Sequence, residues 1–157
     1  MSRVGIGYDS HRLVAGRPLI IGGVEIDFER GLSGHSDADV LAHAVTDAVL
    51  GAAGAGDIGT HFPPSDERWK DADSIELLRT IVASLDGRVV NVDATVICER
   101  PPIGPHRAAI EERLGSALGA PVSVKATTNE GLGAIGREEG IAAIAVASYE
   151  PADGDSE

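Results

Sequence analysis

Apolar side chains alternate with small or polar ones in several short segments, and this period of two predicts β-strands. In the first such segment, Val4, Ile6 and Tyr8 alternate with glycine and aspartate. Two short apolar runs flank Gly22-Gly23, a pair typical of a two-residue hairpin turn. The sequence therefore predicts strands at residues 4–9, 19–21, 24–26, 90–96, 122–126 and 141–149.

Longer segments with helical spacing of apolar residues lie between these strands. An alanine-rich segment over residues 37–53 predicts a long helix, with Ser36 or Asp37 as its N-cap. Apolar positions on one face predict two more helices at residues 75–85 and 110–118. This order of elements predicts an α+β fold, in which a mixed sheet carries its helices on one face.

The last predicted strand is apolar on both faces. Its odd positions from Ile141 to Ala145 are as apolar as its even positions from Ala142 to Val146. Helices can cover only one face of such a strand, so the second face needs another cover. We expect a partner subunit there, and hence an oligomer.

The length and charge of the chain narrow the possible classes of protein. With 157 residues, we expect one catalytic domain over residues 1–150, followed by a disordered acidic tail at 151–157. Lys and Arg number 13 against 25 Asp and Glu, which gives a net charge of −12. Nucleic acids and anionic membranes attract basic surfaces, so we expect neither as a partner.

Cysteine usage and the absence of long apolar runs bear on location. The single cysteine, Cys98, excludes an intrachain disulfide and a multi-cysteine zinc site. The first residues lack the apolar run of a signal peptide, and no stretch approaches the roughly 20 apolar residues of a membrane span. A cytoplasmic protein is the simplest expectation.

Three residues could bind a metal ion. Asp9 and His11 lie two apart on a predicted strand and so share a face. They could equally form a hydrogen-bonded pair at a strand end. His43 lies in the middle of a largely apolar helix, where an imidazole without a partner would be costly. Together the three offer O, N and N ligands, the set of a catalytic zinc site with an open position.

Two loops carry further candidate chemistry. In the Pro/Gly-rich loop 56–66, Asp57 and Asp66 could accept hydrogen bonds from substrate hydroxyls, although such loops often only turn the chain. The segment 125–137 offers hydroxyls, backbone amides and Arg137 to phosphate oxygens, and Glu130 could hold a hard cation there. Residues 131–136 match G-x-G-x-x-G, but a strand rather than a helix is predicted next, so we reject a dinucleotide site.

Four segments of the sequence match a known enzyme family. They are GYDSH, IIGGVEI, GLSGHSDADVLAHAVTDAVLGAAGAGDIGTHFP and VKATTNEGLGAIGREEGIA. They resemble the 2-C-methyl-D-erythritol 2,4-cyclodiphosphate synthase family of the non-mevalonate isoprenoid pathway, over residues 4–149. The resemblance implies a homotrimer with active sites between subunits. It implies a lyase that closes 4-diphosphocytidyl-2-C-methyl-D-erythritol 2-phosphate to the cyclic 2,4-diphosphate and releases CMP.

The resemblance also implies roles for individual residues. Asp9, His11 and His43 would bind zinc, and Glu130 would hold magnesium or manganese on the substrate phosphates. His35 and Thr128 match positions that stabilise the transition state. Residues 98–104 match a cytosine pocket, in which Pro102 replaces a common Lys. The implied substrate-binding residues are Asp9, Ser10, His11, His35, Ser36, Asp57, Ile58, Gly59, Phe62, Pro63, Pro64, Ser65, Asp66, Cys98, Glu99, Arg100, Pro101, Pro102, Ile103, Gly104, Thr127, Thr128, Asn129, Glu130, Ala134 and Arg137.

Two other functions fit the same residues. A metal-dependent phosphohydrolase would use a similar His/Asp set to activate water. A trimeric module could bind metal or nucleotide without turning anything over. The resemblance along the whole chain and the implied cytosine pocket favour the cyclising enzyme.

Overall fold

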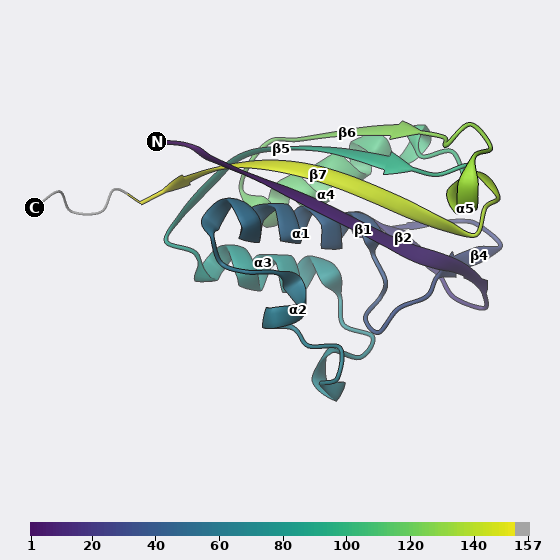
Figure 1. Ribbon diagram of the computed structural model, residues 1–157, viewed down its shortest axis with the longest axis horizontal. Helices are drawn as coiled ribbons and strands as arrows, with labels where there is room; N and C mark the ends of the chain where they lie inside the picture. The colour runs from purple at the N-terminus through teal and green to yellow at the C-terminus, as the bar shows by residue number, and fades with distance from the viewer. Residues whose placement is uncertain (153–157) are drawn as a thin grey trace, which may run out of the picture.

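A five-stranded mixed sheet dominates the computed structural model, which describes residues 1–152 (Figure 1). The strand order is β4-β1-β7-β5-β6, and only the β5–β6 pair is parallel. The predicted mixed sheet is therefore confirmed. The strands are β1 (Arg3–Ala15), β4 (Arg30–Leu32), β5 (Gly87–Ile97), β6 (Val122–Thr127) and β7 (Gly140–Pro151).

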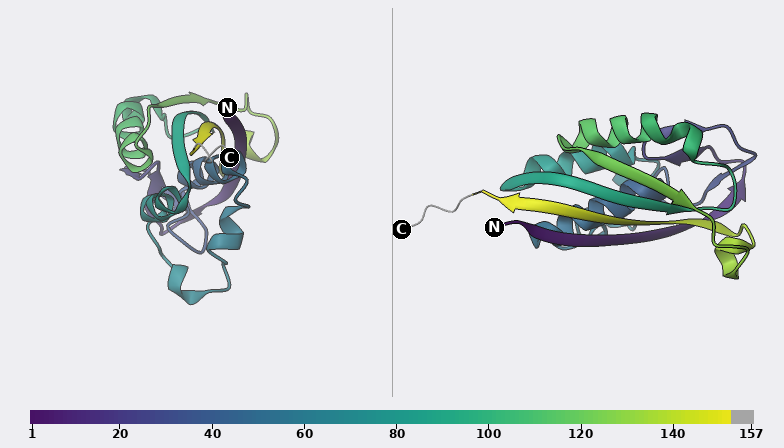
Figure 2. Two further views of the ribbon diagram at one scale, coloured as in Figure 1. Left: turned by 90° about the vertical axis from the view of Figure 1, so that its left-hand side faces the viewer. Right: turned by 90° about the horizontal axis from the view of Figure 1, so that it is seen from above.

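Three long helices pack against one side of this sheet, as the sequence predicted (Figures 1 and 2). They are α1 (Val40–Ala53), α3 (Ser74–Ser84) and α4 (Arg107–Leu118). Helix α1 packs on β1 and β7, and α4 packs on β6 and α3. None of the described helices is long and apolar enough to cross a membrane.

Several short elements complete the described residues. The predicted hairpin forms, but β2 (Leu19–Ile21) and β3 (Val24–Ile26) make a separate two-stranded ribbon. Both turn glycines, Gly22 and Gly23, have positive φ, as this tight turn requires. The sequence did not predict β4, α2 (Ile58–His61), α5 (Gly133–Gly136) or the 3-10 turns Glu67–Trp69 and Gly104–His106.

Helix α1 lies directly against the backbone of β1. A Cβ added to Gly7 would lie 1.9 Å from Ala44 O, and one added to Gly5 would lie 2.1 Å from Ala48 O. Only glycine leaves room for such an approach. The odd positions of β1 therefore face the helix, and its larger apolar side chains point away from it.

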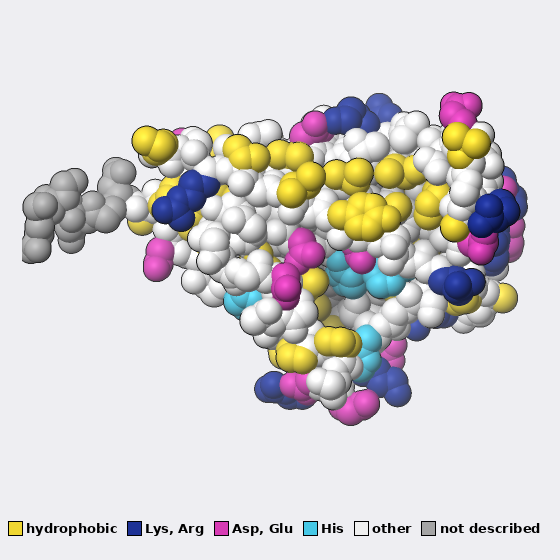
Figure 3. All heavy atoms as spheres, in the orientation of Figure 1, with side chains coloured by type: hydrophobic (Ala, Val, Ile, Leu, Met, Phe, Trp, Pro, Cys, Tyr) yellow, Lys and Arg dark blue, Asp and Glu magenta, His cyan; other side chains and the backbone are white. Residues whose placement is uncertain are grey.

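An apolar stripe consequently lies on the helix-free face of the sheet. Val4 and Ile6 are each 70% exposed and Tyr8 is 60% exposed, while Ile144 and Val146 on β7 are 37% and 40% exposed. Because β1 pairs with β7, these five residues form a continuous patch (Figure 3). The predicted second apolar face of the last strand is present.

Three sequence predictions need correction. The helix predicted from residue 37 begins at Val40, and its N-cap is Asp39 rather than Ser36 or Asp37. In β5, a register shift between Val89 and Asn91 brings Val89 into the core, whereas strict alternation along the predicted strand 90–96 would have put Val90 on the same face as the buried Val92. Two residues predicted to belong to the tail are part of the fold instead, because Pro151 ends β7 and Ala152 N donates to Asp86 O. The rest of that tail, residues 153–157, lies outside the described residues.

Asp39 ties the hairpin to the start of α1. Its carboxylate accepts hydrogen bonds from Gly22 N at 2.8 Å, Gly23 N at 2.7 Å and Ala42 N at 3.0 Å. Complete burial raises the pKa of Asp39 to about 6 despite these donors. Asp39 therefore holds the β2–β3 turn against the N-terminus of α1, the helix that carries His43.

Candidate metal centre and cavity

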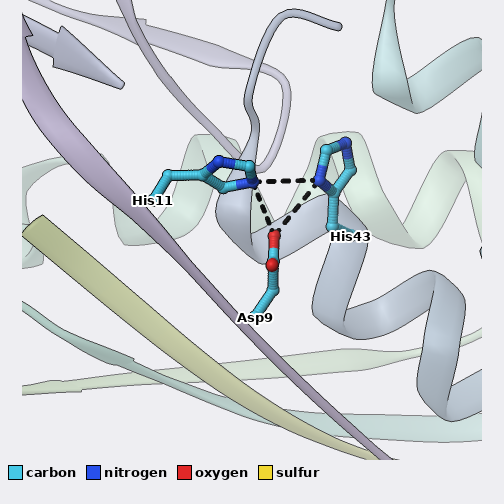
Figure 4. Close-up of side chains that lie close together, drawn as sticks. All are labelled: Asp9, His11 and His43. Atoms are coloured by element: carbon cyan, nitrogen blue, oxygen red, sulfur yellow. Dashed lines mark hydrogen bonds and ion pairs between the residues drawn. The ribbon is translucent and has the colours of Figure 1, made fainter. Parts of the chain in front are cut away.

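Asp9, His11 and His43 come together where β1 meets α1 (Figure 4). Asp9 Oδ2 lies 2.8 Å from His11 Nε2 and 3.1 Å from His43 Nδ1, and the two ring nitrogens are 3.3 Å apart. This is the cluster that the spacing of Asp9 and His11, with His43 on the following helix, led us to predict. Among the described residues it is the one group of His, Cys, Asp and Glu arranged to hold a metal ion.

The hydrogen bonds behind His11 suit this cluster to a cation. His11 Nδ1 lies 2.8 Å from Ser33 O. A carbonyl oxygen can only accept, so we assign the ring proton to Nδ1. The lone pair of Nε2 then points at Asp9 and His43, as in many histidine metal sites. A carboxylate and two imidazoles fit a divalent metal such as zinc.

Proton binding at the cluster follows from its burial and its charges. Burial opposes ionisation of Asp9, but hydrogen bonds and charges from His11 and His43 outweigh it and lower the pKa of Asp9 to about 2. Burial likewise opposes protonation of His11, but the hydrogen bond and charge of Asp9 prevail and raise its pKa above 6.5. Asp9 therefore makes it easier for His11 to hold a proton when no metal is bound.

Metal affinity should therefore depend steeply on pH. A metal at Nε2 must displace the His11 proton, so affinity is full above the raised His11 pKa. It should fall by about tenfold per unit as pH drops below that pKa, since one proton is released per metal. Zinc titrations with a competing chelator at several pH values measure this slope. A profile that stays flat down to about pH 5, below even the ordinary imidazole pKa of about 6.5, would contradict the assignment.

The cluster opens into a cavity of about 240 Å³. Figure 3 shows histidine side chains at the wall of this hollow. Ser36 is buried within it, and His35 Nε2 lies 3.1 Å from Asp66 O. The lining residues are His11, His35, Ser36, His43, Ile58, Gly59, Phe62, Pro64, Trp69 and Leu77.

The loop residues predicted to bind substrate divide into two groups. Ile58, Gly59, Phe62 and Pro64 line the cavity, whereas Pro63, Ser65 and the Asp57 and Asp66 side chains do not. Asp57 caps α2 by accepting from Thr60 N at 2.8 Å, and hydrogen bonds from Thr60 lower its pKa. Asp66 accepts from Arg68. Ser10 is exposed on the opposite face of β1 from Asp9.

The predicted nucleotide and phosphate residues form a second cluster that does not line this cavity. Glu99 joins its two segments by accepting from Asn129 N at 2.7 Å and from Gly131 N at 3.3 Å. Arg100 Nη2 pairs with Glu138 at 2.9 Å. Burial raises the pKa of the Cys98 thiol to about 12, which suits packing rather than catalysis. The cluster covers residues 98–104 and 127–137, including Pro101, Pro102, Ile103, Gly104, Thr127, Thr128, Glu130, Ala134 and Arg137.

Known proteins share both the sequence and the fold. A model of the YgbB family matches residues 2–150. The chain belongs to the YgbB family. This membership confirms the resemblance seen in the sequence, because the family's curated relatives carry the same enzyme name.

Three YgbB-family relatives illustrate the similarity. The 2-C-methyl-D-erythritol 2,4-cyclodiphosphate synthase of Symbiobacterium thermophilum is 62% identical over 150 residues, which cover 92% of this chain and 96% of the relative. The synthase of Salinibacter ruber is 56% identical over 156 residues, covering 96% and 99%. The Plasmodium falciparum IspF in complex with CDP superposes with a TM-score of 0.83 at 32% identity, covering 97% of each chain.

Sequence reasoning missed several residues of this YgbB-family site. Trp69 packs edge-on against Phe62, with ring centroids 4.8 Å apart, and both line the cavity with Leu77. As the only tryptophan, Trp69 was a visible signal. Ser33 and Ser74, which contact the two histidine rings, carry no signal of their own in the sequence.

Proposed function

We propose that the protein catalyses the reaction for which its relatives are named. The substrate is 4-diphosphocytidyl-2-C-methyl-D-erythritol 2-phosphate, and the products are the cyclic 2,4-diphosphate and CMP. The observation that carries the proposal is the Asp9, His11 and His43 cluster at the wall of a cavity, in a chain that matches the YgbB model over residues 2–150. The catalytic domain consists of residues 1–150 together with Pro151, which ends β7, and Ala152.

The reaction needs positioning and charge neutralisation rather than an enzymic nucleophile. An oxygen of the 2-phosphate attacks the β-phosphorus, and the bond from that phosphorus to the oxygen it shares with the α-phosphate breaks. CMP leaves with that oxygen. A divalent metal bound at the cluster supplies positive charge to phosphate oxygens. His35 and Ser36 offer polar groups beside it, and Phe62, Pro64 and Trp69 wall the site against water.

The site is completed by a neighbouring subunit in a homotrimer. The proposal is supported by the exposed stripe of Val4, Ile6, Tyr8, Ile144 and Val146, an apolar patch of the kind that marks protein interfaces. It is supported too by the second cluster, which carries the nucleotide and phosphate residues but does not line this chain's own cavity. A neighbour would bring its residues 98–104 and 127–137 to the cavity, with Thr128 beside the phosphates.

Ile6→Asp is expected to break this assembly. A charge at the centre of the stripe would have to be buried without a partner, so monomers should predominate and activity should fall more than about tenfold. Light scattering coupled to gel filtration measures the mass. Ala109→Asp on the exposed side of α4 is the matched control and should leave the mass unchanged. An Ile6→Asp protein with the same mass as the wild type would contradict the assembly.

Glu130 would hold a magnesium or manganese ion, which would supply positive charge to the substrate phosphates. Its carboxylate is exposed, and its hard oxygens suit such ions. Glu130→Gln keeps the shape but removes the charge, so the magnesium concentration for half-maximal rate should rise by about tenfold. An unchanged magnesium titration would remove Glu130 from the site.

Phosphorus NMR of the protein with substrate, zinc and magnesium tests the reaction itself. Cyclisation gives CMP and a pair of coupled diphosphate signals without inorganic phosphate. Monophosphates from attack by water would favour a phosphohydrolase. No turnover with metal bound would favour a binding module. We also propose a cytoplasmic location, since the chain's one cysteine is a free, buried thiol.

A further inference from the structure

A buried serine and an aspartate stand behind His43, on the side away from the metal cluster. Ser74 Oγ lies 2.8 Å from His43 Nε2 and is hydrogen-bonded to Asp37 Oδ1. Ser74 N also donates to Asp37 Oδ2 at 3.0 Å. Ser74 is 1% exposed, so water does not compete for its hydroxyl. A chain of contacts thus runs from Asp37 through Ser74 to His43.

We propose that Asp37 and Ser74 act as positioning residues that fix the tautomer of His43 for metal binding. An ionised carboxylate can only accept, so the hydroxyl proton of Ser74 goes to Asp37. Ser74 Oγ can then only accept from the ring, which places the ring proton on Nε2. His43 Nδ1 is then left with its lone pair for a metal, and that nitrogen faces Asp9 and His11. In the metal-free protein Asp9 Oδ2, 3.1 Å from Nδ1, competes as an acceptor for the ring proton, and the Asp37–Ser74 pair acts against it.

A second serine offers the opposite arrangement. Ser36 Oγ lies 3.1 Å from His43 Nε2 and accepts from Ala38 N at 3.3 Å, so its own hydroxyl proton is free for the ring. Donation from Ser36 would move the ring proton to Nδ1, where it would block a metal. Because the hydroxyl proton of Ser74 goes to Asp37, that tautomer would bring a lone pair of Ser74 Oγ and the lone pair of His43 Nε2 together at 2.8 Å. The Asp37–Ser74 pair therefore favours the tautomer with the proton on Nε2, which metal binding at Nδ1 requires.

Ser74→Ala removes the deciding hydroxyl and leaves Ser36 as the neighbour of Nε2. Loss of such an outer contact typically weakens metal binding by about 10–100-fold, and we expect a zinc affinity reduced within that range. Asp37→Asn should act in the same direction, because Ser74 donates to both carboxylate oxygens and the amide nitrogen that replaces one of them cannot accept. Zinc titration against a competing chelator measures both.

Asp73→Asn is the matched control. Asp73 caps the same helix, α3, through Ile75 N at 2.9 Å but makes no contact with His43. It should therefore bind zinc as the wild type does. If Ser74→Ala binds zinc as tightly as Asp73→Asn does, the positioning role is wrong.

Nitrogen-15 NMR of the metal-free protein reads the tautomer directly, at a pH where the His43 ring is neutral. Asp9 competes for the proton in both proteins, so the share of His43 rings that carry it on Nε2 should be larger in the wild type than in Ser74→Ala. An equal share in the two proteins would overturn the inference. The inference rests on the proposed metal site, but the failures differ: a wild type that binds no zinc contradicts that site, whereas the NMR result judges the tautomer alone.

Discussion

His43→Ala is expected to abolish zinc binding and turnover while leaving the protein folded. The ring supplies one of three converging ligands, and losing it leaves Asp9 and His11 alone on β1. Since even outer contacts of a metal site contribute up to about 100-fold, removing a ligand should lower kcat/KM by more than that. Alanine suits the interior of α1, so the helix should persist. Bound zinc and steady-state rates measure the effect.

His61→Ala is the control for this variant. His61 is an exposed histidine on α2 whose Nε2 contacts Ala55 O at 2.8 Å, and it does not line the cavity. Its loss should change kcat/KM little. Full activity in His43→Ala would show that the metal assignment is wrong.

Gly7→Ala is expected to unfold or strongly destabilise the protein. The new Cβ would lie 1.9 Å from Ala44 O and 2.7 Å from Ala48 N, both backbone atoms of α1. Because neither can rotate away, the helix must move off the sheet, at a cost of about 3 kcal/mol, the upper end for overpacking. Moving α1 also separates His43 from Asp9 and His11, so zinc affinity should fall with stability. Urea unfolding of the wild type and the variant at the same protein concentration measures the loss of stability.

Gly51→Ala tests the same helix without the collision. A Cβ there would come no nearer than 3.8 Å to Gly5 Cα, an ordinary contact. Replacing a glycine within α1 should stabilise the protein by up to about 1 kcal/mol. Equal losses in the two variants would mean that the close approach of β1 and α1 is not what Gly7 provides.

Local signals in the sequence predicted most of the fold. The Gly22-Gly23 turn, the alternation of β1 and the helical spacing around Leu78 each depend on neighbouring residues alone, and the structure contains the elements they indicate. The errors lie where a distant contact decides. Asp39, not Asp37, caps α1 because the hairpin amides meet it there, and the shift in β5 depends on its pairing with β7.

The metal cluster could be predicted because few residue types bind metals and two of its members share a strand. The orientation of the two histidine rings toward Asp9 depends on their contacts with Ser33 and Ser74. Both serines are distant in sequence from the histidines they contact. The roles of Thr128, Glu130 and residues 98–104 rest on family resemblance and stay predictions. These residues do not line the cavity of their own chain, and no local pattern in the sequence predicts which other cavity they would line.

The two sides of β1 serve two different purposes. Its odd positions bring Gly5, Gly7, Asp9 and His11 to the helix, while its even positions carry the exposed Val4, Ile6 and Tyr8. Inserting or deleting one residue near Tyr8 would exchange these sides for part of the strand, since side chains alternate along it. Interface and metal ligands would be lost together. A change of one residue in the length of this strand would therefore remove in one step both features that single substitutions such as Ile6→Asp or Gly7→Ala affect one at a time.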